Sequence, residues 1–168
     1  MRIEDFKSNY VIGARPNLFK IEITGENLPK LEFLAKAAAI PGKTIGDIDV
    51  PYMGKKIKLA GDVTFEDWQL TVLMDEDYGV RKGLEQWMER IERNSSALAA
   101  NAHKQYKRDA YIIHLGNNGN VINKYQMIGC YPSQLSSIDM NWETTDQVIE
   151  YTVTMRFDWW KNDYIPAA

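Results

Sequence analysis

The chain has 168 residues, of which 45% are apolar and 26% charged, and its formal net charge is −3. This length and composition are typical of one ordinary soluble domain that buries a core without disulfides or metals. The slight excess of acidic residues disfavours a protein that holds nucleic acid, but not one that lets nucleic acid pass. We therefore expect a single domain over residues 1–168.

Several classes of site and location are disfavoured. No run approaches the roughly 18 apolar residues of a membrane span, and residues 1–5 lack the apolar segment of a secretory signal. We therefore expect no membrane anchor, and folding in a cytoplasm. Cys130 is the only cysteine, and the two histidines fit no metal-binding spacing. We expect Cys130 to be a buried thiol, and we expect no metal, cofactor or catalytic residues.

The first two predicted strands precede the central part of the chain. Phe19, Ile21 and Ile23 alternate with polar residues, which predicts a half-buried strand. A second strand is predicted from Leu31 to Ile40, where Pro41-Gly42 ends it.

Residues Ile45–Gly61 predict a long β-hairpin with its turn at Met53-Gly54, where glycine supplies a positive φ. This turn sets a register with apolar pairs on one side and a charge pair on the other: Val50 opposite Ile57, Ile48 opposite Leu59, and Asp49 opposite Lys58. A ribbon with one apolar side must bury it against its own domain or a neighbouring copy.

A strand and the only predicted helix follow. Asp67 to Met74 predicts a strand that places Trp68, Leu70 and Val72 on one face. Asp75 and Asp77 are candidate helix N-caps. The helix ends at Asn94-Ser95-Ser96, and its apolar stripe is expected to pack in the core: Val80, Leu84, Trp87, Met88 and Ile91.

Four more strands are predicted after the helix. Tyr111–Leu115 and Val121–Ile128 flank Gly116–Asn120, a hairpin-loop signal. In each of the last two predicted strands, apolar and polar residues alternate. The apolar residues are Ile138, Met140 and Trp142 in the first of them and the odd-numbered residues from Tyr151 to Trp159 in the second. The chain is thus predicted to be mainly β: an antiparallel β-sandwich or barrel with one flanking α-helix and a long protruding β-hairpin.

Two motifs have competing interpretations. Ala37–Thr44 fits a relaxed phosphate-loop pattern, but a strand pattern follows Thr44 and Pro41 lacks an N–H donor, so we interpret it as a strand end and turn. A nucleotide-hydrolysing enzyme using Gly42–Thr44 remains an alternative. The aromatic run at Trp159-Trp160 is expected to pack on its own domain or on a neighbouring subunit.

An ordered series of segments resembles the tail tube protein of contractile-tailed bacteriophages. It comprises Ala14–Phe19, Lys36–Gly42, Val50–Ile57 and Ala60–Trp68, followed by a strand and a helix. The resemblance runs nearly end to end, and is strongest between residues 14 and 77.

The resemblance implies a non-enzymatic structural subunit of the virion tail, assembled in the host bacterial cytoplasm. It implies hexameric rings whose subunit sheets join around a lumen, and which stack into a tube that conducts double-stranded DNA. Implied partners are other copies of the chain, the tail sheath protein, the baseplate tube initiator, the tape-measure protein and the tail terminator. The alternatives are the tube of a bacteriocin tail, an extracellular injection system or type VI secretion, and, in another class, a monomeric β-rich binding module.

Two groups of residues are the candidates for the functional surfaces. Expected intersubunit contacts are Ile45, Ile48, Val50, Tyr52, Met53, Ile57, Leu59, Trp159 and Trp160. Expected lumen-facing residues are Asp139, Asn141, Glu143, Glu150, Thr152 and Thr154, with an outer, sheath-facing position as the alternative. A polar wall without excess positive charge would let DNA pass without holding it.

Overall fold

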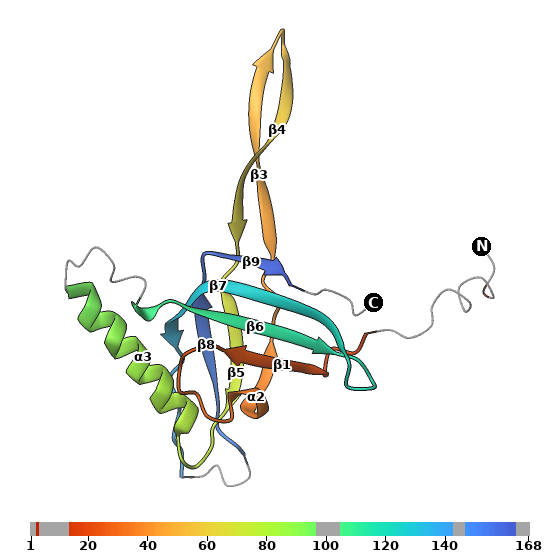
Figure 1. Cartoon of the computed structure of the whole chain (residues 1–168). Helices are drawn as coiled ribbons and strands as arrows, with labels where there is room; N and C mark the ends of the chain where they lie inside the picture. The colour runs from red at the N-terminus through yellow and green to blue at the C-terminus, as the bar shows by residue number, and fades with distance from the viewer. Residues whose placement is uncertain (1–2, 4–13, 97–104, 143–146, 164–168) are drawn as a thin grey trace.

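The computed structural model describes residues 3, 14–96, 105–142 and 147–163. Its strands form two antiparallel layers that cross one another (Figure 1). The first layer contains β1 (Phe19–Ile23), β6 (Arg108–Leu115), the first part of β7 (Val121–Leu135) and β9 (Trp159–Asn162). The second contains the last part of β7, β8 (Glu150–Arg156), β5 (Trp68–Leu73) and β2 (Ala35–Ala38).

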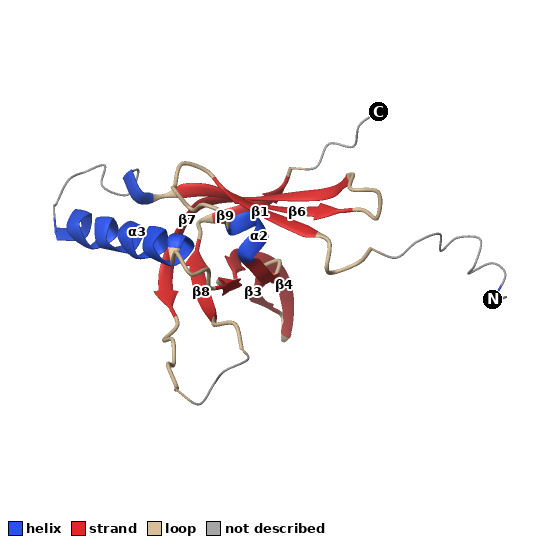
Figure 2. Cartoon of the chain, turned by 90° about the horizontal axis from the view of Figure 1, so that it is seen from below, coloured by secondary structure: helices blue, strands red, loops and turns tan. Residues whose placement is uncertain are grey.

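The long strand β7 joins the two layers, because its first part pairs with β6 and its last part with β8. The strand order is β1-β6-β7-β8-β5-β2, and its end strands β1 and β2 do not pair with each other. The sheet is therefore an open, sandwich-like arrangement and not a closed barrel. Helix α3 (Gly79–Ser96) lies along one side of the two layers (Figure 2).

The core lies between the layers and beneath α3. Trp68, Leu70 and Val72 of β5 are buried, as their shared parity predicts. The alternating residues Tyr151, Val153 and Met155 of β8 are also buried, as are Val80, Leu84 and Trp87 of α3. The Nε1–H of Trp87 donates a 2.7 Å hydrogen bond to the carbonyl of Tyr106, which satisfies the polar atom of this large side chain. Cys130 is buried, and burial raises the pKa of its thiol, so it is protonated and unreactive at neutral pH.

The segment Leu31–Ile40 is not one strand, as the sequence predicted. A short helix α2 (Leu31–Leu34) comes first and β2 follows it. Lys30 has a left-handed conformation, φ 64°, and its carbonyl accepts hydrogen bonds from the N–H groups of Phe33 and Leu34. This turn buries Leu31 and leaves Phe33 exposed, so only Ala35–Ala38 are left to pair with β5.

The start of α3 also differs from the prediction. The residue before the first helical residue is Tyr78, and not Asp75 or Asp77. Tyr78 has a left-handed conformation, φ 54°, and its carbonyl accepts a hydrogen bond from the N–H of Lys82. Asp75 accepts a hydrogen bond from the N–H of Glu76 and forms an ion pair with Lys30. The Lys30 ammonium lowers the pKa of Asp75 through that contact. Asp75 therefore fixes the loop before the helix instead of capping it.

The strand predicted around residues 138–142 does not form. The last ladder contact of β7 and β8 is the hydrogen bond from the N–H of Ser136 to the carbonyl of Thr152. β8 begins at Glu150, two residues before Thr152. Because the two strands are antiparallel, the chain soon after Ser136 extends beyond the start of β8 and has no residues of β8 to pair with. The last predicted strand is divided into β8 and β9 at Phe157-Asp158, where Asp158 forms an ion pair with Lys107.

Replacing Leu84 by alanine is expected to destabilise the domain by about 2–5 kcal/mol, because it leaves a cavity beneath α3. Urea unfolding followed by tryptophan fluorescence measures this loss. The matched control is Phe33→Ala, which removes an exposed side chain and is expected to change the free energy of unfolding by no more than about 0.5 kcal/mol. Equal losses in the two variants would contradict the core assignment.

Candidate functional site

The most prominent surface feature is the hairpin of β3 (Lys43–Tyr52) and β4 (Lys55–Phe65), which projects away from both layers (Figure 1). It continues the pair formed by β2 and β5, because the chain runs directly from β2 into β3 and from β4 into β5. Backbone hydrogen bonds from Ala39 to Gln69 and from Glu66 to Gly42 connect the two pairs. The β2–β5 pair and the β3–β4 hairpin are therefore parts of one long two-stranded ribbon.

The turn and the register agree with the sequence prediction. Tyr52 pairs with Lys55 across Met53 and Gly54, whose φ angles of 45° and 78° are both left-handed, as in a type I′ turn. The expected pairs are all present: Val50 with Ile57, Ile48 with Leu59, and Asp49 with Lys58. The ion pairs run diagonally, however, from Lys58 to Asp47 at 2.8 Å and from Lys56 to Asp49 at 3.4 Å.

A register shift bends the ribbon near its base. It lies between Ile45 and Asp47, where Gly46 comes close to Gly61. A Cβ added at Gly61 would lie 3.0 Å from the carbonyl oxygen of Gly46, a tight contact, so glycine favours this close approach.

The apolar side of the hairpin is not covered by the part of the domain that the structure describes. Each of its expected contact residues is at least 40% exposed: Ile45, Ile48, Val50, Tyr52, Met53, Ile57 and Leu59. Packing of these residues on the same chain, one of the two expectations, is therefore not found in the described part of the chain. Their burial against another copy stays a prediction.

The neighbouring residues Trp159 and Trp160 of β9 differ in how far they are buried. Trp160 is partly buried and packs edge-on against Tyr125, with ring centroids 5.4 Å apart, and against Phe65 at 6.2 Å. Trp159, its neighbour in β9, is half exposed. Trp160 thus supports the base of the hairpin through Phe65, whereas contact of Trp159 with a neighbouring subunit stays a prediction.

Three of the expected lumen residues share the outer face of the second layer. Thr152 and Thr154 of β8 lie opposite Thr71 and Gln69 of β5, and Glu150 lies opposite Leu73. These positions alternate with the buried ones along β8, so the outward face is polar. Glu150 also forms an ion pair with Lys36 of β2.

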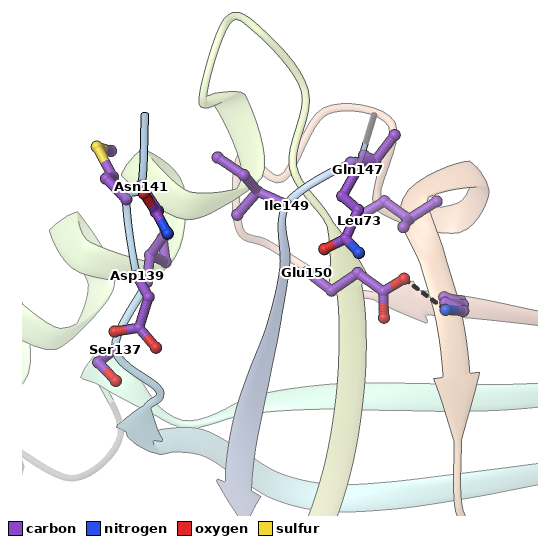
Figure 3. A pocket seen from close by; sticks show the side chains of 11 residues that line it. Leu73, Ser137, Asp139, Asn141, Gln147, Ile149 and Glu150 are labelled. Carbon is purple, nitrogen blue, oxygen red and sulfur yellow. Dashed lines mark hydrogen bonds and ion pairs between the residues drawn. The ribbon is translucent and has the colours of Figure 1, made fainter. Parts of the chain in front are cut away.

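The other expected lumen residues are not on that face. Asp139 and Asn141 lie in the exposed segment after β7, beyond the end of the sheet, and Glu143 lies outside the described residues. Asp139 and Asn141 line an open pocket with Glu150 (Figure 3). The same segment carries Met140 and Trp142, which alternation assigned to the core but which are exposed. No pattern within residues 138–142 could have predicted this exposure, because strand formation there depends on where the partner strand β8 begins.

The phosphate-loop alternative has no structural basis. Lys43 and Thr44 are the first residues of strand β3, so no helix N-terminus is present to bind a phosphate. Among the described residues, no cluster of His, Cys, Asp or Glu could hold a metal ion. None of the described helices has the length and apolar character required to cross a membrane.

Comparison with known proteins gives the family. The model of the phage tail tube protein family matches residues 6–163, nearly the whole chain. The chain belongs to the phage tail tube protein family. The resemblance predicted from the sequence is thereby confirmed, and the protein is a structural component of the virion tail.

Individual relatives agree with this membership. The tail tube protein of Enterobacteria phage T4 is 29% identical over 151 residues, covering 88% of this chain and 91% of the relative. The tail tube protein of Serratia phage KSP90 is 26% identical, covering 74% of this chain and 70% of the relative.

Solved structures share the fold. One is a chain in the sheath–tube complex of an extracellular contractile injection system, with a TM-score of 0.68, 14% identity, and coverage of 95% of this chain and 98% of that one. Another is from the tube-terminating cap of the anti-feeding prophage, with a TM-score of 0.68, 15% identity, and coverage of 92% and 93%.

Replacing Gly54 by valine is expected to weaken the tail tube protein's hairpin by about 1–2 kcal/mol, because a β-branched residue is strained at φ 78°. Met53→Asn is the matched control, since asparagine favours the left-handed conformation that Met53 already has. Amide hydrogen exchange of residues 48–59 should speed up in the first variant and not in the second. Unchanged exchange in the Gly54→Val variant would contradict the turn assignment.

Proposed function

We propose that this tail tube protein forms hexameric rings that stack into the inner tube of a contractile phage tail and conduct DNA during ejection. The observation that supports stacking most directly is the uncovered apolar side of the hairpin. Seven large side chains that project from the body of a small domain need a partner surface. Fully burying one of them contributes about 1.5–3 kcal/mol, and six equivalent contacts per ring would act together.

Lateral joining is supported by the edges of the second layer. Within the described chain β2 pairs only with β5, and the last part of β7 pairs only with β8. These two unpaired edges lie on opposite sides of the same layer. Pairing of one copy's β2 with the next copy's β7 would extend the layer around a ring and remove both edges.

The lumen is proposed to face the outer side of this layer. Thr71, Gln69, Thr152 and Thr154 offer neutral hydroxyl and amide groups, and the charge of Glu150 is balanced by Lys36. Such a surface keeps water next to the duplex and neutralises few phosphates, so DNA passes without being retained. In this role no covalent chemistry is required of the protein.

The proposed partners follow from the same role. A sheath protein would surround the tube, a baseplate initiator would start it, a tape-measure protein would occupy it, and a terminator would end it. The titles of the similar structures name a sheath–tube complex and a tube-terminating cap in those systems. The alternative is a tube of the same architecture in another contractile injection machine, which the neighbouring genes would distinguish: a capsid gene indicates a phage.

Electron microscopy of the purified protein tests the proposal. Rings or tubes are expected for the wild-type chain, and Ile48→Thr with Leu59→Thr is expected to leave rings that do not stack. Threonine is β-branched and favours strands, so the double change preserves the strand preference of the ribbon but removes an apolar cross-strand pair. A compact monomer at high concentration, or tubes of undiminished length in the double variant, would contradict the proposal.

Glu150→Lys combined with Thr152→Lys is expected to slow DNA ejection by about tenfold or more at low salt, because each added ammonium can neutralise a phosphate. Ejection from phage carrying the variant, followed by a DNA-binding dye, measures the rate. Glu89→Lys with Gln86→Lys adds the same charge on exposed positions of α3 and is the control. If the α3 variant slows ejection and the β8 variant does not, the lumen assignment is wrong.

A further inference from the structure

The hairpin tip and the open pocket lie at opposite ends of one ribbon. The tip is formed by Tyr52–Lys55, where β3 turns into β4. At the other end of the ribbon, β5 ends at Leu73, which pairs with Glu150. β2 begins there at Ala35, and Lys36 is its second residue. Figure 1 shows the hairpin at one extreme of the molecule and the start of β8 near the other. Copies displaced along the ribbon direction would therefore bring the tip of one chain to the pocket of the next.

The pocket has a mixed polar and apolar wall, and the described residues leave two of its large apolar side chains uncovered. It has a volume of about 1190 Å³ and lies between residues 137–141, residues 147–150 and the ends of β2 and β5 (Figure 3). Met140 and Val148 on its wall are 74% and 65% exposed. Large apolar side chains this exposed, around a hollow, are suited to contact with another protein surface.

The charges at the two ends are complementary. At the tip, Lys56 and Lys58 form ion pairs with Asp49 and Asp47, whereas Lys55 has no ionic or hydrogen-bond partner among the described residues. In the pocket, Glu150 pairs with Lys36, whereas exposed Asp139 has no such partner in the described part of the chain. Within the described residues, Lys55 at the tip and Asp139 on the pocket wall are thus opposite charges without a partner.

We propose that this pocket is the acceptor for the hairpin tip of a second copy of the chain in the adjacent ring. Tyr52 and Met53 enter between Met140 and Val148, and Lys55 pairs with Asp139. The inference rests on the proposed tube and specifies the surface that receives the hairpin. The contact is heterologous, since each copy uses different surfaces to donate and to accept, and it propagates without closing. A symmetric tip-to-tip contact is disfavoured because it would bring the two Lys55 side chains together.

Crosslinking in assembled tubes tests the contact. Met53→Cys and Met140→Cys are introduced together, and tubes are treated with a bismaleimide; buried Cys130 gives no background. The expected result on a denaturing gel is a ladder that extends beyond the number of subunits in one ring, because every chain both donates and accepts. Neither single variant should give a ladder. The control pair is Met53→Cys with Ile122→Cys, an exposed residue on the β6–β7 hairpin, and it should not give one either.

A charge exchange tests the ion pair. Lys55→Glu and Asp139→Lys are each expected to raise the critical concentration for tube formation about three- to tenfold, since a weak contact is repeated around each ring. The double variant, which restores opposite charges, should return close to the wild-type value. Unchanged thermal unfolding of each single variant shows that the fold is intact.

The outcomes distinguish the inference from the function on which it rests. Wild-type chains that never form stacked rings would overturn both. Tubes that form normally but give no Met53–Met140 ladder, or a double charge variant as impaired as the single variants, would overturn the acceptor pocket and leave the tube proposal standing.

Discussion

The structure depends on a single constraint: among the described residues, the apolar side of the β3–β4 hairpin has no partner that covers it. Ile48, Val50, Ile57 and Leu59 form cross-strand pairs that stabilise the ribbon, yet all four stay exposed to solvent. An isolated two-stranded ribbon is only marginally stable in water, so its apolar side favours association. The core of the domain is made of other residues, so the hairpin is available for the proposed contact between copies.

The base of the hairpin connects the projecting ribbon to the core of the domain. Phe65, at the end of β4, contacts both Phe157 and Trp160, and Trp160 packs on Tyr125 of the first layer. The next residues of the chain lead to Trp68, which is fully buried between the layers. These contacts therefore anchor the base of the ribbon in the core. A projecting element fixed in this way loses little conformational entropy when it binds, which favours the contact.

The distribution of charge supports the same organisation. Most ionic groups of the hairpin are paired along the ribbon, and the outer face of β8 and β5 is dominated by threonine and glutamine. The domain thus presents polar groups on one broad face, where the charges of Glu150 and Arg156 are paired with Lys36 and Asp67, and apolar groups along a narrow projection. This division is consistent with a wall that must not retain a polyanion and a connector that must hold another subunit.

The sequence by itself determined the elements whose pattern is local: the alternation of β1, β5 and β8, the apolar stripe of α3, and the hairpin with its turn at Met53-Gly54 and its register. Period-2 and period-3.6 patterns report which side of an element is buried, and left-handed turn residues fix a hairpin without reference to the rest of the chain. Only the tertiary structure decided what each surface meets. Met140 and Trp142 alternate like core residues but are exposed, because β8 begins at Glu150 and leaves them no strand to pair with. The apolar side of the hairpin faces solvent because the ribbon extends beyond the two layers. Burial depends on neighbours that are distant in the sequence, and a pattern along one segment contains no information about them.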